Sequence, residues 1–270
     1  MRPLAIRKRC WPKGSHQKEP LAPSRSLAAF NPFLMSMILR SSIVLALSAG
    51  VALAESKPGE WPAFRGTNNG LAVAPKSVRD WKRVQLKKVW KEDTPAGFSS
   101  FAVAGGKAYT IVTDEVDGNK GEVLVAHDAK TGKKAWSKPL GVISKYDGGG
   151  DAGTNENKGG DGPRSTPVVD GGLVYAIDAN LGVYCFNALD GKPVWSHDVM
   201  KENAGVQIKW QNAASPLIDG NVLLMCGGGP GQALIGFDKA TGKILWKGED
   251  DKMTHATPVS ADILGVHQVI

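Results

Sequence analysis

The chain has 270 residues, enough for one large domain or two small ones, and its apolar fraction of 42% argues against a disordered protein. The formal net charge of +7 lies in the N-terminal segment. Residues 1–54 hold eight basic side chains and one acidic one, which leaves 25 of each in residues 55–270. Because the body of the chain is neutral, its charge gives no reason to expect binding to nucleic acid.

The N-terminal segment predicts export. Residues 37–40 supply a short basic start, residues 41–53 are apolar or small, and Ala52-Leu53-Ala54 fits a signal-peptidase site. We therefore expect a signal peptide at 37–54 that is cleaved after Ala54, a periplasmic or secreted protein, and no membrane span after cleavage. A buried helix is the alternative for this apolar run.

Residues 1–36 are basic, rich in Pro and without periodicity. We interpret them as a miscalled, non-native leader that precedes a start at Met35 or Met37; a cytoplasmic N-terminal tail is the alternative. Residues 55–97 are expected to form an N-terminal segment and a partial repeat unit, because Val89-Trp90 resembles the end of the repeat that follows.

A turn followed by a tryptophan recurs in the body of the chain. In each copy an Asp or Asn lies eight residues before a Trp, and a Gly lies four residues before it. The Asx side chain can cap a turn and the Gly supplies a positive φ, so each copy predicts two strands joined by a hairpin turn. The copies are Asp128, Gly132 and Trp136; Asn187, Gly191 and Trp195; and Asp238, Gly242 and Trp246.

Two further strands precede each of these turns. Apolar runs broken by an Asp-Gly or Gly-Gly turn begin at Ser100, Thr166 and Ser215. Four strands per unit, with no helical period between units, predict an all-β fold of four-stranded antiparallel propeller blades. A two-sheet sandwich is the alternative, although it would not need an identical Trp in each unit. We assign blades to 98–136, 165–195 and 214–246, with the next blade starting at 256, so that 98–270 holds about three full blades and partial ones.

Residues 126–136 have the pattern A-x-D-x-x-T-G-x-x-x-W, which resembles the repeat of the pyrroloquinoline-quinone (PQQ)-like β-propeller family, also called quinoprotein alcohol dehydrogenase-like. The third copy fits with Gly236 in place of the Ala, whereas the second departs with Cys185 and Asp190. The opening motif of residues 61–66 and the strand start at 162–167 resemble the BamB-like exported propellers of planctomycete type. The resemblance covers residues 61–270.

This resemblance implies about seven or eight blades with the repeat Trp side chains wedged between neighbouring blades. It implies a non-catalytic scaffold that binds a protein or a cell-envelope component and needs no cofactor, which is the function that we favour. The alternative is a fragment of a PQQ-dependent alcohol dehydrogenase of the polyvinyl-alcohol type, which would need PQQ and Ca²⁺. No catalytic or metal-binding residue of those enzymes is matched in this sequence, so none is assigned.

Five residues are candidates for ligand binding at the mouth of the propeller funnel. Arg164 follows a Gly-rich stretch and could bind a carboxylate or phosphate, unless it pairs with a neighbouring blade. Trp210, Gln211 and Asn212 lie in the corresponding place one blade later, and His255 in the next. Packing is the alternative role for Trp210, and a satisfied or surface position is the alternative for His255.

Two other features have structural explanations. Asp147, Asp151 and Asp161 resemble a calcium loop but miss its spacing, which favours a surface loop. Cys185 and Cys226 each lie in an apolar run, so we expect two separate buried thiols, although the sequence leaves a disulfide open.

Overall fold

The computed structural model describes residues 59–67, 70, 80–85, 87–143, 162–208 and 210–270. The leader, the signal peptide and the loop with Asp147, Asp151 and Asp161 therefore lie outside the described residues. The chain divides into two units, Met1–Gly50 and Val51–Ile270, and everything below concerns the second.

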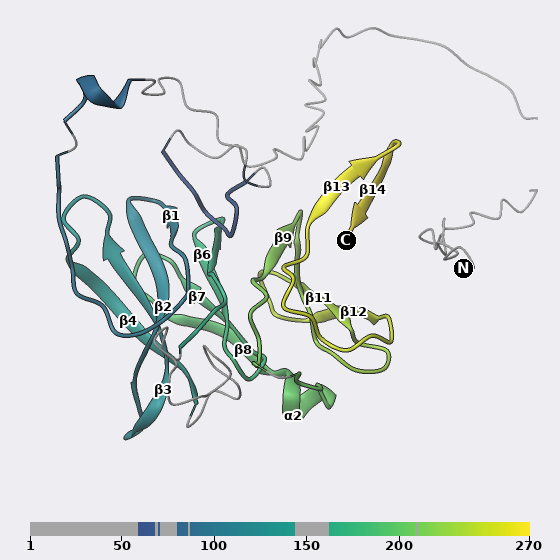
Figure 1. Cartoon of the computed structure of the whole chain (residues 1–270). Helices are drawn as coiled ribbons and strands as arrows, with labels where there is room; N and C mark the ends of the chain where they lie inside the picture. The colour runs from purple at the N-terminus through teal and green to yellow at the C-terminus, as the bar shows by residue number, and fades with distance from the viewer. Residues whose placement is uncertain (1–58, 68–69, 71–79, 86, 144–161, 209) are drawn as a thin grey trace, which may run out of the picture. The chain divides into compact units, whose positions relative to one another are not determined.

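Three antiparallel sheets of four strands follow one another along the chain, each with its strands in sequence order (Figure 1). The first has β1 (Ala102–Ala104), β2 (Lys107–Val116), β3 (Asn119–Asp128) and β4 (Lys134–Val142). The second has β5 (Val168–Asp170), β6 (Leu173–Ile177), β7 (Gly182–Asn187) and β8 (Pro193–Asp198). The third has β9 (Leu217–Asp219), β10 (Val222–Met225), β11 (Leu234–Asp238) and β12 (Ile244–Gly248). This confirms the predicted all-β fold of four-stranded blades.

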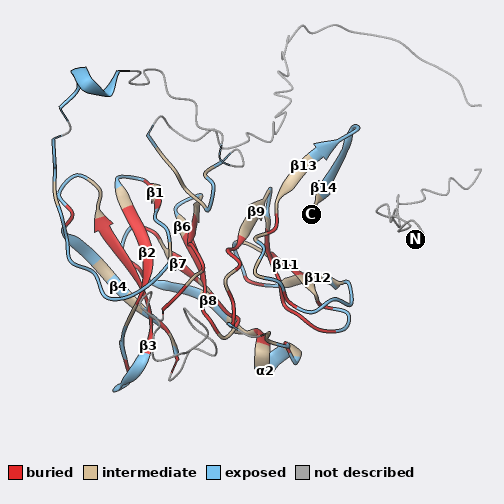
Figure 2. Cartoon of the chain, viewed as in Figure 1, coloured by how far each residue is buried: buried red, intermediate tan, exposed pale blue. Residues whose placement is uncertain are grey.

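The hairpin β13 (Ser260–Ile263) and β14 (Val266–Val269) forms a fourth, two-stranded sheet. The helices of the described residues are short: η1 (Trp81–Arg83) and α2 (Val199–Asn203). Within the described ranges, no helix is long and apolar enough to span a membrane. Figure 2 shows that the buried positions concentrate on the middle strands of the four-stranded sheets, whereas the β13–β14 hairpin is largely exposed.

The turn between the last two strands of a blade is held by its Asx side chain. In the first blade, Asp128 Oδ1 accepts hydrogen bonds from the backbone N–H of Lys130 and from both the N–H and the hydroxyl of Thr131. Asp238 and Thr241 repeat the two bonds to the Thr. These bonds explain why Asp and Thr stand three residues apart in the repeat.

Trp136 and Trp195 each pack on the turn of the following blade. Trp136 Nε1 donates to Ala188 O at 3.3 Å, and Trp195 Nε1 donates to Lys239 O at 3.0 Å. A Cβ atom on the turn glycine would collide with the ring: it would lie 2.9 Å from Trp136 at Gly191. Glycine is thus required both by its positive φ of 71° and by this close approach.

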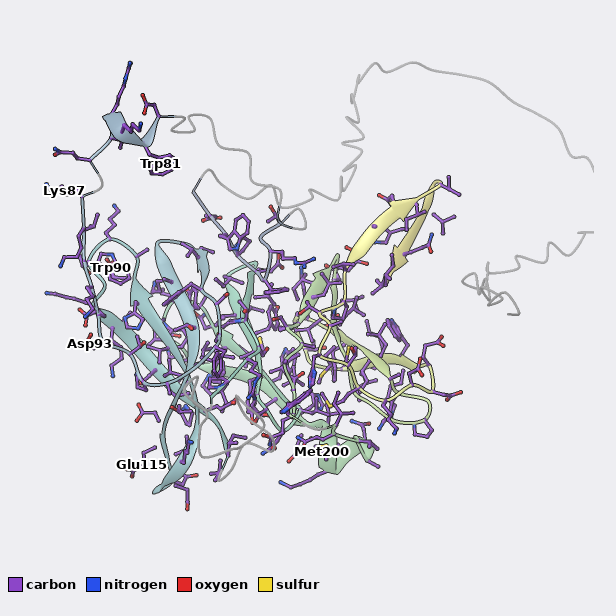
Figure 3. All side chains as sticks on the ribbon, viewed as in Figure 1. Trp81, Lys87, Trp90, Asp93, Glu115 and Met200 are labelled. Carbon is purple, nitrogen blue, oxygen red and sulfur yellow. The ribbon has the colours of Figure 1, made fainter. Side chains whose placement is uncertain are left out.

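Trp90 makes the same contact one blade earlier. Its Nε1 donates to Ala129 O at 3.0 Å, and a Cβ atom at Gly132 would lie 2.6 Å from its ring. Figure 3 shows Trp90 on the segment that leads to the first blade. Trp90 thus occupies the place of a repeat Trp from a preceding blade, in agreement with the resemblance of Val89-Trp90 to a blade end.

A series of hydroxyl groups joins the starts of the blades. Ser100 N donates to Thr166 Oγ1, Thr166 N to Ser215 Oγ, and Ser215 N to Thr257 Oγ1, at 3.2, 2.9 and 2.9 Å. Each hydroxyl therefore satisfies the backbone donor of the blade before it. This explains the Ser or Thr at the start of each apolar run.

The core lies between neighbouring sheets. Tyr175, Leu223 and Phe237 are fully buried members of the cluster shared by the second and third blades. Cys185 and Cys226 are buried free thiols, as expected. Burial raises the pKa of the Cys185 thiol to about 12, which keeps it protonated and unreactive.

Candidate functional site

The five predicted residues lie on connections that run from the last strand of one sheet to the first strand of the next. Arg164 lies between β4 and β5, Trp210 to Asn212 between β8 and β9, and His255 between β12 and β13. The structure brings all five together, and we call them the rim cluster: Arg164, Trp210, Gln211, Asn212 and His255.

Arg164 links two of these connections. Its Nη1 donates to Trp210 O at 3.2 Å, and its guanidinium lies 5.7 Å from the centroid of the Phe98 ring. Phe98 and Trp210 are 47% and 42% exposed. The surface therefore combines two aromatic side chains with a planar cation, a combination suited to binding a carboxylate or an aromatic or proline side chain.

Phe98 was missed by the sequence reasoning. It precedes the first blade as Arg164 precedes the second, and its backbone N–H donates to Pro163 O at 2.7 Å. The available signal was its place before the run that begins at Ser100, but an exposed Phe has no motif of its own.

His255 and Trp210 are held against each other. The rings have centroids 6.0 Å apart and are tilted by 42°. His255 Nε2 lies 3.0 Å from Gln211 O, and because a carbonyl only accepts, this nitrogen carries the hydrogen. Trp210 and Gln211 both have left-handed backbones, with φ of 73° and 57°, which the surrounding contacts must stabilise.

Gln211 and Asn212 are the buried members of the rim cluster, and their side chains bond to other parts of the chain. Gln211 Nε2 donates to Asn180 Oδ1 at 3.1 Å. The Asn212 amide group donates to Asp178 O and Ala214 O and accepts from Ala214 N. Because both amide side chains are buried, the side chains of the rim cluster that reach the surface are those of Arg164, Trp210 and His255.

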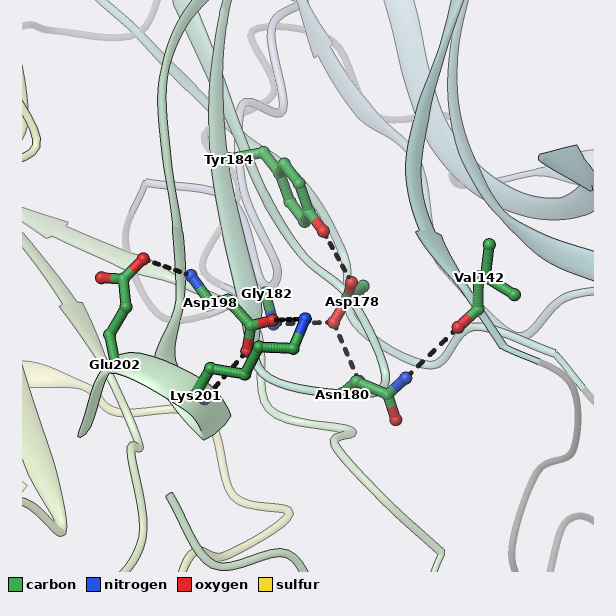
Figure 4. A network of polar contacts seen from close by, with 8 residues as sticks. All are labelled: Val142, Asp178, Asn180, Gly182, Tyr184, Asp198, Lys201 and Glu202. Carbon is green, nitrogen blue, oxygen red and sulfur yellow. Dashed lines mark hydrogen bonds and ion pairs between the residues drawn. The ribbon is translucent and has the colours of Figure 1, made fainter. Parts of the chain in front are cut away.

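A buried carboxyl group lies in the loop that Asn212 contacts. Asp178 accepts hydrogen bonds from Asn180 N, Gly182 N and the Tyr184 hydroxyl at 2.8, 2.7 and 2.9 Å (Figure 4). Burial nevertheless raises the pKa of Asp178 to about 6, the three hydrogen bonds opposing the shift only in part. Next to it, the buried Glu122 accepts from Ala179 N at 3.0 Å. The sequence showed neither as a buried acid: Asp178 lies in the turn after β6, and Glu122 lies within β3.

The dehydrogenase alternative would need carboxylate and amide oxygens that hold a calcium ion. Within the described residues, no group of three or more His, Cys, Asp or Glu side chains could hold a metal ion. The buried amide of Asn212 and carboxylate of Asp178 already bond to the protein. We therefore derive no chemical step through calcium or a quinone.

The chain is similar to proteins of one family. The family described as outer membrane protein assembly factor BamB matches residues 119–270. The outer membrane protein assembly factor BamB of Bordetella pertussis is 24% identical over 218 residues, which make up 76% of this chain and 47% of that protein. The chain thus spans about half the length of this relative.

Solved structures show weaker similarity. BamB from Moraxella catarrhalis is 16% identical, with a TM-score of 0.36 over 61% of this chain and 52% of that one. The quinohemoprotein alcohol dehydrogenase from Comamonas testosteroni is 18% identical, with a TM-score of 0.39 over 57% of this chain and 21% of that one.

Proposed function

Since this chain belongs to the family of the outer membrane protein assembly factor BamB, whose match covers residues 119–270, we propose that it is an exported, non-catalytic propeller scaffold that binds a protein partner of the cell envelope. The partner surface is the rim cluster together with Phe98. The proposal of export rests on the signal peptide predicted at 37–54, with cleavage after Ala54.

The arrangement of Phe98, Arg164 and Trp210 carries this proposal. Exposed aromatic and Arg side chains that are held in place dominate the binding energy of protein interfaces. Here the Arg is fixed by the Trp210 carbonyl and the Phe98 ring, and the Trp by the His255 ring. Little side-chain freedom is left to lose when a partner binds.

Site-specific photo-crosslinking in cells that export the protein tests the proposal. Benzoylphenylalanine is placed at position 98, where it replaces another exposed aromatic side chain. We expect a crosslinked envelope protein whose yield falls about tenfold with Arg164→Ala or Trp210→Ala, since each removes a central contact.

The matched control places the same amino acid at position 81, because Trp81 is 62% exposed but lies on η1, outside the rim cluster. That position should give no such product. Equal products at both positions, or a product unaffected by Arg164→Ala, would show that the rim cluster is not the partner surface.

A further inference from the structure

The N-terminal segment shows how a peptide can bind the inner edge of these blades, the side of each first strand that faces away from its second strand. Trp61 and Val103 exchange two backbone hydrogen bonds, at 2.8 and 2.7 Å. Val169 N then donates to Pro62 O at 2.8 Å. The segment thus pairs with the first strands of the first and second blades through its backbone.

The third and fourth sheets present the same edge. Val103, Val169 and Ile218 each occupy the middle position of a three-residue first strand, opposite Ala108, Val174 and Leu223. Because backbone groups of successive residues in a strand point to opposite sides, the N–H and C=O of Ile218 point away from β10, as those of Val103 point away from β2.

Ser260 stands at this position in β13. Its neighbour Val259 exchanges two backbone hydrogen bonds with Ile270, at 3.0 and 2.9 Å. The backbone N–H and C=O of Ser260 therefore point away from β14, toward the inner edge. Among the described residues, neither Ile218 nor Ser260 has a hydrogen-bond partner on the inner edge. Two of four equivalent positions are therefore occupied and two are open.

A cavity of about 790 Å³ lies along the open positions. Its lining includes Ile218 and Ser260, the apolar residues Leu217 and Pro258, and the Phe64–Arg65 turn of the N-terminal segment. The lining is mixed in polarity, as expected for a site that would take up both a peptide backbone and its side chains.

Arg65 is the cation at this cavity for which no ion pair is found among the described residues. Lys239 Nζ pairs with Asp170 at 2.6 Å, and His267 lies between Asp219 and Asp262, at 2.9 and 2.8 Å. Arg65 lies 5.6 Å from the Phe64 ring centroid and makes no ion pair with any described residue. A ligand in the cavity would therefore be favoured by an acidic group near Arg65.

We propose that the open inner edge at Ile218 and Ser260 binds an extended peptide segment of a partner protein by strand addition, with an acidic group of the peptide near Arg65. The peptide backbone supplies a carbonyl to Ile218 N–H and an N–H to Ile218 C=O, as Trp61 does for Val103. His255 of the rim cluster also lines this cavity, but strand addition at Ile218 and Ser260 does not depend on the function proposed for the rim cluster.

Amide hydrogen exchange of the full chain tests the proposal. The probe is the synthetic peptide Glu-Trp-Pro-Ala-Phe with a free C-terminal carboxylate, which copies residues 60–64. Without it, the amides of Ile218 and Ser260 should exchange at least about tenfold faster than those of Val103 and Val169. With it, their exchange should slow by about tenfold, while Val103 and Val169 stay protected.

Three results would overturn the proposal. Ile218 and Ser260 could be as protected as Val103 in the free chain, so that the edge is already closed. A saturating concentration of the peptide could leave their exchange unchanged. The peptide could instead expose Val103 and Val169, which would mean that it displaces the N-terminal segment.

Two variants separate backbone pairing from charge. Ile218→Pro removes the N–H that faces the cavity and keeps the bonds to β10, but it also removes a side chain that packs against the core. It should weaken peptide binding about tenfold, whereas Ile218→Ala, which removes that side-chain packing and keeps the N–H, should not. Arg65→Gln should weaken binding of the carboxylate peptide but not of its C-terminal amide. Equal affinities for wild type and Ile218→Pro would contradict strand addition.

Discussion

At the scale of single residues, Asp178 is expected to control part of the pH dependence of stability. Burial raises its folded pKa to about 6, above the value near 4 of an unfolded Asp. The fold therefore favours the protonated acid: its stabilising contribution is complete below about pH 4 and is lost as the pH rises through about 6. The shift corresponds to roughly 3 kcal/mol of unfolding free energy.

Asp178→Asn should remove this dependence. We expect the variant to lose less stability than wild type between about pH 4 and pH 7, measured by urea unfolding. Asp128→Asn is the control with the opposite sign, because the Thr131 hydroxyl lowers the pKa of that exposed carboxyl and its contribution is lost as the pH falls. Parallel pH curves for wild type and Asp178→Asn would contradict the account of Asp178.

Ser215 is the residue that joins the second and third blades through the hydroxyl series. Ser215→Ala removes the acceptor of Thr166 N–H, and both residues are buried, so the donor is left unpaired at a cost of about 1–3 kcal/mol. Ser215→Thr keeps a hydroxyl and should cost less. Urea unfolding of both variants measures the difference in unfolding free energy. Equal losses of free energy would mean that the Ser215 hydroxyl does not stabilise the contact between the blades.

The residue scale also shows where sequence reasoning stops. Arg164 and His255 could be proposed because their place in the repeat indicated a common mouth. The place of Phe98 beside Arg164 and the burial of Asp178 could not be predicted, since each depends on contacts between connections that are distant in the sequence. Such non-local packing leaves no local pattern in the chain.

At the scale of elements, the repeat predicted the strands and turns well. An Asx cap, a Gly with positive φ and a Trp at fixed spacing are local features that read directly as a hairpin. The pairing of Trp61 and Pro62 with Val103 and Val169 was not predicted, because backbone hydrogen bonds place no demand on the type of side chain.

The packing of a Trp on the next turn gives a test at this scale. Gly191→Ala should cost about 1–3 kcal/mol more than Gly220→Ala, measured by urea unfolding. Both glycines have positive φ, but an added Cβ at Gly191 meets the Trp136 ring, whereas at Gly220 it meets nothing within 4 Å. The fluorescence of Trp136 should shift only in the first variant.

Equal destabilisation by the two substitutions would contradict tight packing between blades. It would mean that the backbone conformation alone explains the glycine of the repeat.

At the scale of the whole molecule, consecutive blades are joined both at their inner strands and at their outer strands. The hydroxyl series lies at the starts of the inner strands, and the Trp side chains cover the turns between the outer strands. This leaves the connections between blades to form the rim cluster and the inner edge to pair with extended chains. A scaffold that binds through these surfaces needs no reacting group.

Whether the molecule is a scaffold or an enzyme is decided by one measurement on the exported protein. It is incubated with PQQ and Ca²⁺, and both its melting temperature and its dye-linked oxidation of alcohols are recorded. We predict no change in melting temperature and no oxidation. A melting temperature raised by quinone and calcium together, accompanied by alcohol oxidation, would contradict a non-catalytic scaffold.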